Sequence, residues 1–400
     1  MADVIIVGAG PGGSAAAAIL ARGGCRVLLI DRAKFPRPKS CGDYLNPGCT
    51  TILSRIGVWD AVAAVSAPVA GMRLVAADGT RAPTTFSAGL GCSLPRAALD
   101  HVLVTHAAGE GASVIEEASV VCIDREARHV RVTVARGRGK VRLEQHLASL
   151  VIGADGLGSK VARSIGAGTP LRHGRFAVGG YLEGLAPDSS DGDRRPFGEL
   201  HLARDRYCGV AYFPDGRANV TIALPPRELR TWWGALEVRY WEALRAFPGL
   251  RDRVRSAALV GRLRATGPLA FCRRRAATRG VLLTGDAAGF IDPMTGQGVY
   301  LALRGGELAA NAVARALGGG GATMRNLAGY ERARRRAFGS AFLLSRLLQR
   351  IAFHPGLAAR ALRRMALRPD LGTQFIDAVG NVRPAASVFQ PAFLAGLLGL

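Results

Sequence analysis

The first strand and turn of the chain constrain its fold more than any other feature. Residues 4–18 read VIIVGAGPGGSAAAA, a continuous apolar run that ends in Gly8, Gly10 and Gly13 and leads into a small-residue helical pattern. At this spacing the first glycine allows a sharp turn, the second lets the backbone approach a pyrophosphate, and the third lets helix and strand pack closely. Asp31 ends the next apolar run, where its carboxylate can accept hydrogen bonds from both ribose hydroxyls. The sequence therefore predicts a βαβ unit that binds a dinucleotide.

Two further motifs follow in the chain. The second is VIGADGLGSKVAR at residues 151–163, and the third is GVLLTGDAAGFIDPMTGQGVYLAL at residues 280–303. Three such motifs in this order resemble the glutathione-reductase-type FAD oxidoreductases, the p-hydroxybenzoate hydroxylase-like superfamily that includes aromatic hydroxylases, flavin-dependent halogenases and geranylgeranyl reductases. The resemblance covers residues 4 to about 315.

FAD is the cofactor that this resemblance implies. In the third motif, Asp286 can accept a ribityl hydroxyl, and the amides around Gly296, Gln297 and Gly298 can reach the flavin edge where negative charge collects on reduction. Asp155 matches the second motif and is alternatively a turn residue at a strand end. The predicted FAD-binding residues are Gly8, Gly10, Pro11, Gly13, Asp31, Arg32, Lys39, Cys41, Gly42, Arg96, Asp155, Gly285, Asp286, Pro293, Gly296, Gln297 and Gly298.

The segment FPRPKSCGDYLNPG, residues 35–48, resembles the PRxKxCG segment of the geranylgeranyl reductase and halogenase branch. Its thiol, Cys41, is the predicted catalytic residue, either as a proton donor beside the flavin or as a contact to substrate. The alternative is a small buried apolar residue, which most free cysteines are. Arg96 matches a family arginine that contacts the cofactor, and a plain surface arginine is the alternative. The halogenase WxWxIP element has no counterpart among the four tryptophans.

The segment GVAYFP, residues 209–214, resembles the YxWxFP segment that lines the substrate channel of lipid reductases. Gly209 and Ala211 stand at its two aromatic positions, which widens the predicted cavity and argues against a long isoprenoid chain. The predicted substrate-binding residues are Tyr207, Gly209, Ala211, Tyr212, Phe213 and Pro214.

The fold class expected is α/β (α+β), with a Rossmann-type FAD-binding domain, an inserted antiparallel-sheet substrate domain and a C-terminal helical region. The FAD-binding domain is assigned to residues 1–70, 96–165 and 272–320, and the substrate domain to 71–95 and 166–271. Residues 321–400 form the helical region. Between Arg325 and Asp370 it carries eleven arginines against Glu331 and Asp370, which indicates either a solvated helical cap or a basic surface that contacts an anionic membrane.

The charge and the cysteine content of the chain argue against several classes of ligand and partner. The net charge of +23 comes almost wholly from arginines spread along the chain without a nucleic-acid-binding motif, so no nucleic acid is expected. Seven cysteines without a CxxC pair indicate neither a disulfide framework nor a metal site. The sequence shows neither a signal-peptide pattern nor a long apolar span, which predicts a cytoplasmic protein. Peripheral contact with the inner face of the membrane is the alternative form of this prediction.

Three functions stay open from the sequence. The first is a monooxygenase that acts through a flavin C4a-hydroperoxide on a hydrophobic, aromatic or polyketide-like small molecule of specialised metabolism, free or bound to a carrier protein. The second is a reductase or dehydrogenase of isoprenoid or other lipophilic double bonds. A halogenase or a non-catalytic flavin-binding module is the third. No second GxGxxG motif occurs for a nicotinamide cofactor, but the resemblance implies a donor that visits the flavin without a domain of its own. NAD(P)H or a separate reductase is therefore the expected electron donor.

Overall fold

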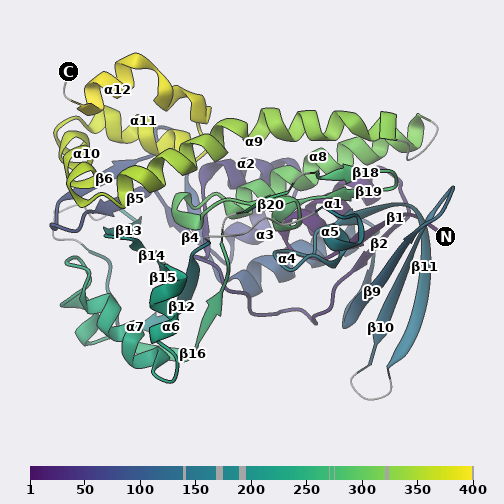
Figure 1. Ribbon diagram of the computed structural model, residues 1–400, viewed down its shortest axis with the longest axis horizontal. Coiled ribbons are helices and arrows are strands. Elements are labelled where there is room, and N and C mark those ends of the chain that lie inside the picture. Colours follow the sequence, from purple (N-terminus) through teal and green to yellow (C-terminus); the bar gives the residue numbers. More distant parts are fainter. Residues whose placement is uncertain are drawn as a thin grey trace.

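The computed structural model describes residues 1–137, 141–167, 174–188, 195–269, 271–273, 275–319 and 324–398. Its largest sheet is built around the predicted βαβ unit (Figure 1). β1 (Ala2–Val7) runs parallel to β2 (Val27–Ile30) on one side and to β11 (Arg142–Gly153) on the other. Val4, Ile5 and Ile6 have no exposed surface, as expected for a parallel strand covered on both faces. The remaining strands of this sheet are β8 (Ser113–Ile115), β9 (Ala118–Arg125), β10 (Val130–Arg136), β18 (Ala277–Thr278) and β19 (Val281–Leu283).

Helices cover this sheet and meet through glycines. α1 (Pro11–Arg22) packs against α8 (Gly298–Gly318) and α4 (Arg96–Gly109). A Cβ atom on Gly306 would lie 2.4 Å from the carbonyl oxygen of Gly12, so α1 and α8 touch at a distance that only glycine permits at position 306. The shorter helices of this half are α2 (Pro47–Arg55), α3 (Trp59–Ala63), α5 (Lys160–Ser164) and the 3-10 turns η2 (Gly285–Ala288) and η3 (Pro293–Thr295).

A second sheet of seven strands has the order β16-β12-β15-β14-β13-β5-β6. Its strands are β5 (Gly71–Val75), β6 (Arg81–Thr85), β12 (Phe176–Glu183), β13 (Phe197–Ala203), β14 (Arg206–Tyr212), β15 (Ala218–Leu224) and β16 (Ala258–Thr266). One face packs on α6 (Pro226–Thr231) and α7 (Leu236–Arg245), with η1 (Arg253–Arg255) nearby, around the buried Tyr240 and Leu244. The opposite face borders a cavity.

The predicted substrate segment 71–95 contributes only its first part to this sheet. β7 (Gly91–Ser93) instead pairs with β3 (Tyr44–Leu45) and β4 (Ala67–Val69) in a separate three-stranded sheet. The two-stranded pair β17 (Phe271–Cys272) and β20 (Gly289–Phe290) is the remaining sheet of the described ranges.

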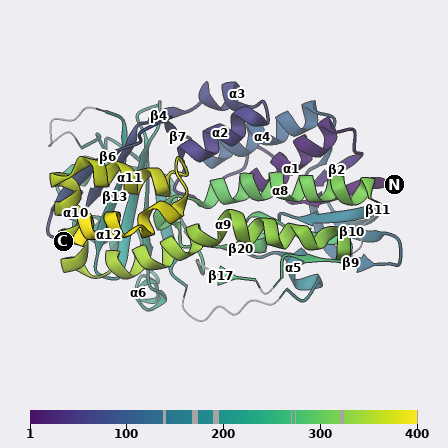
Figure 2. The ribbon, with the colours of Figure 1, turned by 90° about the horizontal axis from the view of Figure 1, so that it is seen from above.

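The chain is helical after the third motif, as the sequence predicts. α9 (Met324–Ala352) has 29 residues, a length of about 43 Å at the helical rise per residue. It passes alongside α8 and continues to the second sheet (Figures 1 and 2). There α10 (Pro355–Leu367), α11 (Pro369–Val379), η4 (Ala385–Phe389) and α12 (Pro391–Leu398) lie over β5, β6 and β13. None of the helices described is both long and apolar enough to cross a bilayer.

Candidate functional site

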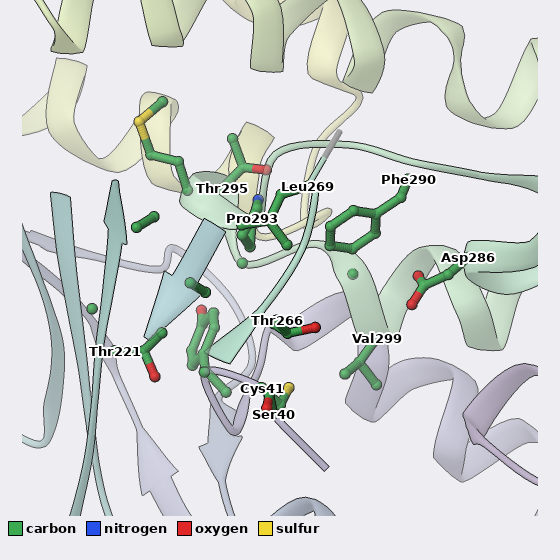
Figure 3. A pocket seen from close by; sticks show the side chains of 18 of the residues that line it. Ser40, Cys41, Thr221, Thr266, Leu269, Asp286, Phe290, Pro293, Thr295 and Val299 are labelled. Carbon is green, nitrogen blue, oxygen red and sulfur yellow. The ribbon is translucent and has the colours of Figure 1, made fainter. Parts of the chain in front are cut away.

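One cavity of about 1060 Å³ joins the three predicted motifs to the second sheet. This volume lies at the upper end of the usual range for small-molecule sites. In the close view, Pro293 and Thr295 lie on one side of the space, and Cys41 and Thr221 lie on the opposite side (Figure 3). The cavity is therefore the place to test each predicted residue.

The glycines of the first motif make a turn that admits no side chains. Gly8 has a φ of 102°, and a Cβ atom there would lie 2.4 Å from the carbonyl oxygen of Ala154. A Cβ atom on Gly13 would lie 1.8 Å from the carbonyl oxygen of Gly8. Gly10 differs, because a Cβ atom there would have only the guanidinium ends of Arg37 and Arg96 at 4.0 Å. Position 10 thus faces open cavity beside two cations, where a pyrophosphate would approach the start of α1.

Asp31 is held at the cavity wall by backbone donors. Its carboxylate accepts hydrogen bonds from the Ala9 N–H at 2.7 Å and the Ala33 N–H at 2.9 Å. The exposed Arg32 lines the cavity next to it. The side chain of Asp31 is thereby fixed at the carboxyl end of β2, the position expected of a ribose-binding acid.

Arg96 belongs to a buried charge cluster. It forms a bidentate pair with the fully buried Asp100, with both distances at 2.9 Å, and Arg37 approaches the same carboxylate at 3.3 Å. Arg37 also lies 3.9 Å from the Asp31 carboxylate, so the two guanidinium groups are balanced by two carboxylates. Arg37 and Arg96 both line the cavity, with one guanidinium nitrogen of each 4.0 Å from the Cβ position of Gly10.

Lys39 and Asp286 also line this half of the cavity. Burial lowers the pKa of the Lys39 ammonium, and the Asp286 carboxylate opposes this effect. Burial likewise raises the pKa of Asp286, with Lys39 acting in the opposite direction. Gly285 and Gly42 lie in the lining as well. An acid, a base and two further positions of the predicted set therefore lie in the cavity lining.

The start of α8 points its backbone toward the same space. Gly296 has a φ of 62°, and Gly296, Gly298 and Pro293 line the cavity. The first N–H groups of a helix have no intrahelical acceptor, so they are available to an anionic flavin edge. Gln297 is different: its side chain is fully buried and donates to the Val379 carbonyl oxygen at 2.9 Å. Gln297 is thus absent from the cavity lining, whereas Gly296 and Gly298 on either side of it belong to that lining.

Asp155 of the second motif stabilises a turn at the edge of the cavity. The Asp155 carboxylate accepts hydrogen bonds from the Ser159 hydroxyl and from the Lys160 and Val161 amides. It therefore holds the turn into α5, and Asp155 and Gly156 also border the cavity.

Cys41 lies on the cavity wall, and burial raises the pKa of its thiol while Arg96 opposes the shift.

Two residues further along the chain, Asp43 accepts several hydrogen bonds, a role that the sequence did not predict. The Asp43 carboxylate accepts hydrogen bonds from the Arg96 amide at 3.2 Å, the Tyr181 hydroxyl at 3.0 Å and the Asn219 side chain at 2.9 Å. Burial raises the pKa of Asp43 to about 6, although these hydrogen bonds oppose it. Its φ of 53°, unusual for a residue with a side chain, was not evident from the sequence.

The predicted substrate residues separate into two groups. Tyr207, Gly209 and Ala211 of β14 line the cavity. Tyr212, Phe213 and Pro214 are absent from its lining: the Tyr212 hydroxyl donates to the buried Glu199 at 2.6 Å, and Phe213 packs edge-on against Tyr181. Alternation along a strand explains the split for Tyr212, because successive side chains point to opposite faces.

Beyond β14 the cavity becomes an apolar pouch under the C-terminal helices. Met72, Leu74, Leu200 and Leu202 line its sheet side. Its helical side is formed by Leu344, Leu347, Leu348, Ile351, Ala352, Ala358, Ala361, Leu362, Met365, Phe375, Ile376, Val379, Val388, Phe393, Leu394 and Leu397. The sequence predicted these helices but not their place in the site, because nothing in their spacing shows which apolar face meets a ligand.

Buried polar contacts join the pouch-lining strand β14 to the third motif. The Tyr207 hydroxyl donates to Asp292 at 2.6 Å, and the Arg175 guanidinium approaches the same carboxylate at 3.6 Å. Arg175 also lies over the Phe353 ring, 3.7 Å from its centroid. This cluster links β14, the third motif and the segment after α9.

The arrangement fits FAD. Open space at Gly10, the cations Arg37, Arg96 and Lys39, and the anchored Asp31 match an adenosine diphosphate moiety, and the α8 amides match a flavin. Within the described ranges, no group of His, Cys, Asp and Glu side chains could hold a metal ion.

Comparison with known proteins agrees with this assignment. Residues 1–343 match the family of FAD binding domains. The chain is 30% identical over 347 residues to a digeranylgeranylglycerophospholipid reductase of Methanothrix thermoacetophila, covering 84% of each chain. It is 31% identical to a menaquinone reductase of Mycobacterium tuberculosis, covering 77% of this chain and 76% of that one.

Solved structures share the fold. A flavoprotein/dehydrogenase from Cytophaga hutchinsonii superposes with a TM-score of 0.80 at 21% identity, over 95% of this chain and 92% of that one. A flavin-dependent brominase superposes with a TM-score of 0.81 at 19% identity, over 95% and 93%. The chain therefore belongs to the FAD-dependent oxidoreductases, with relatives of the geranylgeranyl reductase type, and it is an FAD enzyme.

Proposed function

We propose that this enzyme reduces carbon–carbon double bonds of a long-chain, isoprenoid-type lipid, with electrons from NAD(P)H or a separate reductase. The observation that carries the proposal is the pouch, which continues from the FAD motifs under α9 to α12 and is lined by apolar side chains. A cavity wall of this kind binds hydrocarbon by excluding water from it. The two curated relatives compared above are named as reductases, and one name contains the geranylgeranyl group.

Reduced FAD, when bound, supplies a hydride. The second carbon of the double bond then needs a proton, and two groups on the cavity wall hold one. The Cys41 thiol keeps its proton at neutral pH because burial raises its pKa. Tyr181, whose hydroxyl donates to Asp43 at 3.0 Å, is the second.

The small residues Gly209 and Ala211 are the reason why the sequence favours a bulky substrate and an oxygenation reaction. No atom lies within 4 Å of a Cβ atom built on Gly209, so the middle of the sheet is open. Open space there also accommodates the methyl branches of an isoprenoid chain. The pouch favours the reductase, and oxygenation is the competing outcome of the test.

The test mixes anaerobically reduced, FAD-loaded enzyme with geranylgeranyl diphosphate, geranylgeraniol or a menaquinone. We expect flavin reoxidation that depends on the lipid, with a product carrying two additional hydrogens by mass spectrometry. If the lipids leave the flavin reduced, and added oxygen then yields a product with an additional oxygen atom, the enzyme is a monooxygenase and the proposal is wrong.

A further inference from the structure

The edge strand of the second sheet presents two arginines to the cavity. Along β16, Val260, Arg262, Arg264 and Thr266 line the cavity, whereas Leu259 and Leu263 pack into the hydrophobic core on the opposite face. The strand is irregular here, because its pairing with β12 shifts register between Gly179 and Tyr181 and Gly261 has a φ of 82°. Arg262 and Arg264 both line the cavity at this irregularity.

Both arginines are exposed, and within the described part of the chain neither forms an ion pair or a side-chain hydrogen bond. Most other arginines near the cavity have carboxylate partners, as Arg96 does with Asp100 at 2.9 Å. Two guanidinium groups without carboxylate partners among the described residues at this rim of the cavity favour an anion there.

The cavity face of the sheet changes from charged to apolar across its strands. After the arginines of β16 come Tyr181 on β12, then Asn219 and Thr221 on β15. Gly209 and Ala211 of β14 follow, and β13 and β5 end the series with leucines and Met72, beside the buried Glu199, which pairs with Arg253. β16 and β5 are five strand intervals apart, a span of about 24 Å at the usual strand spacing.

We infer that Arg262 and Arg264 bind the phosphate-bearing headgroup of the lipid, whose hydrocarbon chain crosses the sheet into the pouch. The inference rests on the proposed function and adds the class of substrate: an amphiphile with an anionic phosphate head, not a neutral lipid. One guanidinium group can donate two hydrogen bonds to a phosphate, so two arginines of β16 in the cavity lining suit a diphosphate or phosphodiester. The phosphates of a nicotinamide dinucleotide share this chemistry and are the competing ligand.

The experiment measures binding to the oxidised, FAD-loaded enzyme by calorimetry, without turnover. Geranylgeranyl diphosphate and geranylgeraniol carry the same hydrocarbon and differ only in the head. We expect the wild type to prefer the diphosphate on the order of ten- to a hundredfold, the strength of one or two charge-assisted hydrogen bonds. Added salt weakens that preference and leaves the alcohol unaffected.

The Arg262→Gln/Arg264→Gln variant loses the preference and binds the alcohol as the wild type does. Arg230→Gln is the matched control, since Arg230 is exposed, lies on α6 and does not line the cavity. An unchanged preference in the double variant overturns the inference alone, as does a loss of NADPH affinity without loss of diphosphate affinity. Failure of the wild type to bind either prenyl compound contradicts the proposed function, and the inference with it.

Discussion

At the scale of single residues, Gly10 is the position where a side chain affects only the ligand. Gly8 and Gly13 are closed by backbone atoms, so substitutions there disturb the protein itself. A Cβ atom on Gly10 projects into the cavity and meets no protein atom closer than 4.0 Å. Position 10 thus separates cofactor binding from folding.

We expect Gly10→Val to fold normally and to bind FAD at least about tenfold more weakly, a loss of about 1.4 kcal/mol. The measurement is FAD absorbance per protein after titration, together with the thermal unfolding midpoint. Gly109→Val is the control, because Gly109 is exposed and has open space around it. Retention of FAD by Gly10→Val contradicts the placement of the pyrophosphate.

Asp43 gives a pH-dependent prediction. Burial raises its pKa from 3.8 to about 6 in the folded protein. The folded state therefore keeps the Asp43 proton where the unfolded chain has lost it, so the contribution of Asp43 to stability is fully present below about pH 4 and is lost as pH rises through about 6. The difference corresponds to about 3 kcal/mol.

Asp43→Asn does not titrate. We expect the unfolding free energy of the wild type, minus that of the variant, to decrease from about pH 4 to about pH 7. Denaturant unfolding at several pH values measures it, and every other titrating group is common to both proteins. The variant also loses an acceptor for Asn219 and Tyr181, which shifts the whole curve but not its slope. A constant difference across this range contradicts the prediction.

At the scale of elements, β14 determines how far a chain can enter the pouch. Because Gly209 has no neighbour within 4 Å of its Cβ position, Gly209→Trp fills the cavity without a clash in the sheet. We expect the affinity for geranylgeraniol to fall about tenfold or more, the equivalent of about 1.4 kcal/mol, while geraniol binding changes less. Calorimetry measures both ligands, and Gly209→Ala is the graded control. Equal losses for the two chain lengths would show that the residue acts elsewhere.

The same strand shows what the sequence can predict. Motifs that specify backbone geometry, such as Gly8 with its φ of 102°, were readable because only glycine fits them. The role of β14 in substrate binding is predicted from a resemblance to lipid reductases. The alternation of side chains along the strand places Tyr212 on the face opposite the cavity, where its hydroxyl donates to Glu199. Asp43 lies within a recognised segment, yet its partners come from β12 and β15. Contacts between distant segments carry no local signal.

The C-terminal helices illustrate the same limit. Their amphipathic pattern predicts a buried face, and α10 buries Ala358, Leu362 and Met365 as that pattern requires. The ligand-facing role of these residues follows from the position of α10 over β6 and β13, which the pattern does not contain. The pouch therefore depends on how the helices pack against the second sheet, which their sequence pattern does not specify.

At the scale of the whole molecule, α10 separates the pouch from the surface. Its inner face lines the cavity, and its outer face carries Leu357 and Leu367, which are 51% and 74% exposed. Arg360 and Arg363 lie on the same outer side, where Arg363 pairs with Asp78 at 3.3 Å. Such surface pairs are weak, and the net charge of +23 favours an anionic surface.

We propose that this face contacts anionic membranes, since exposed leucines among arginines suit a lipid interface. We expect the enzyme to cosediment with vesicles containing phosphatidylglycerol but not with purely zwitterionic ones, and less so at high salt. Leu357→Glu/Leu367→Glu weakens the binding, because it places two charges in the apolar contact. Leu143→Glu is the matched control: Leu143 is 66% exposed on the projecting β9-β10-β11 ribbon, at the opposite end of the molecule from α10 (Figure 1). Equal vesicle binding by the two variants would place the membrane contact elsewhere, whereas loss of binding in the α10 variant alone would place the contact at the helix that covers the pouch.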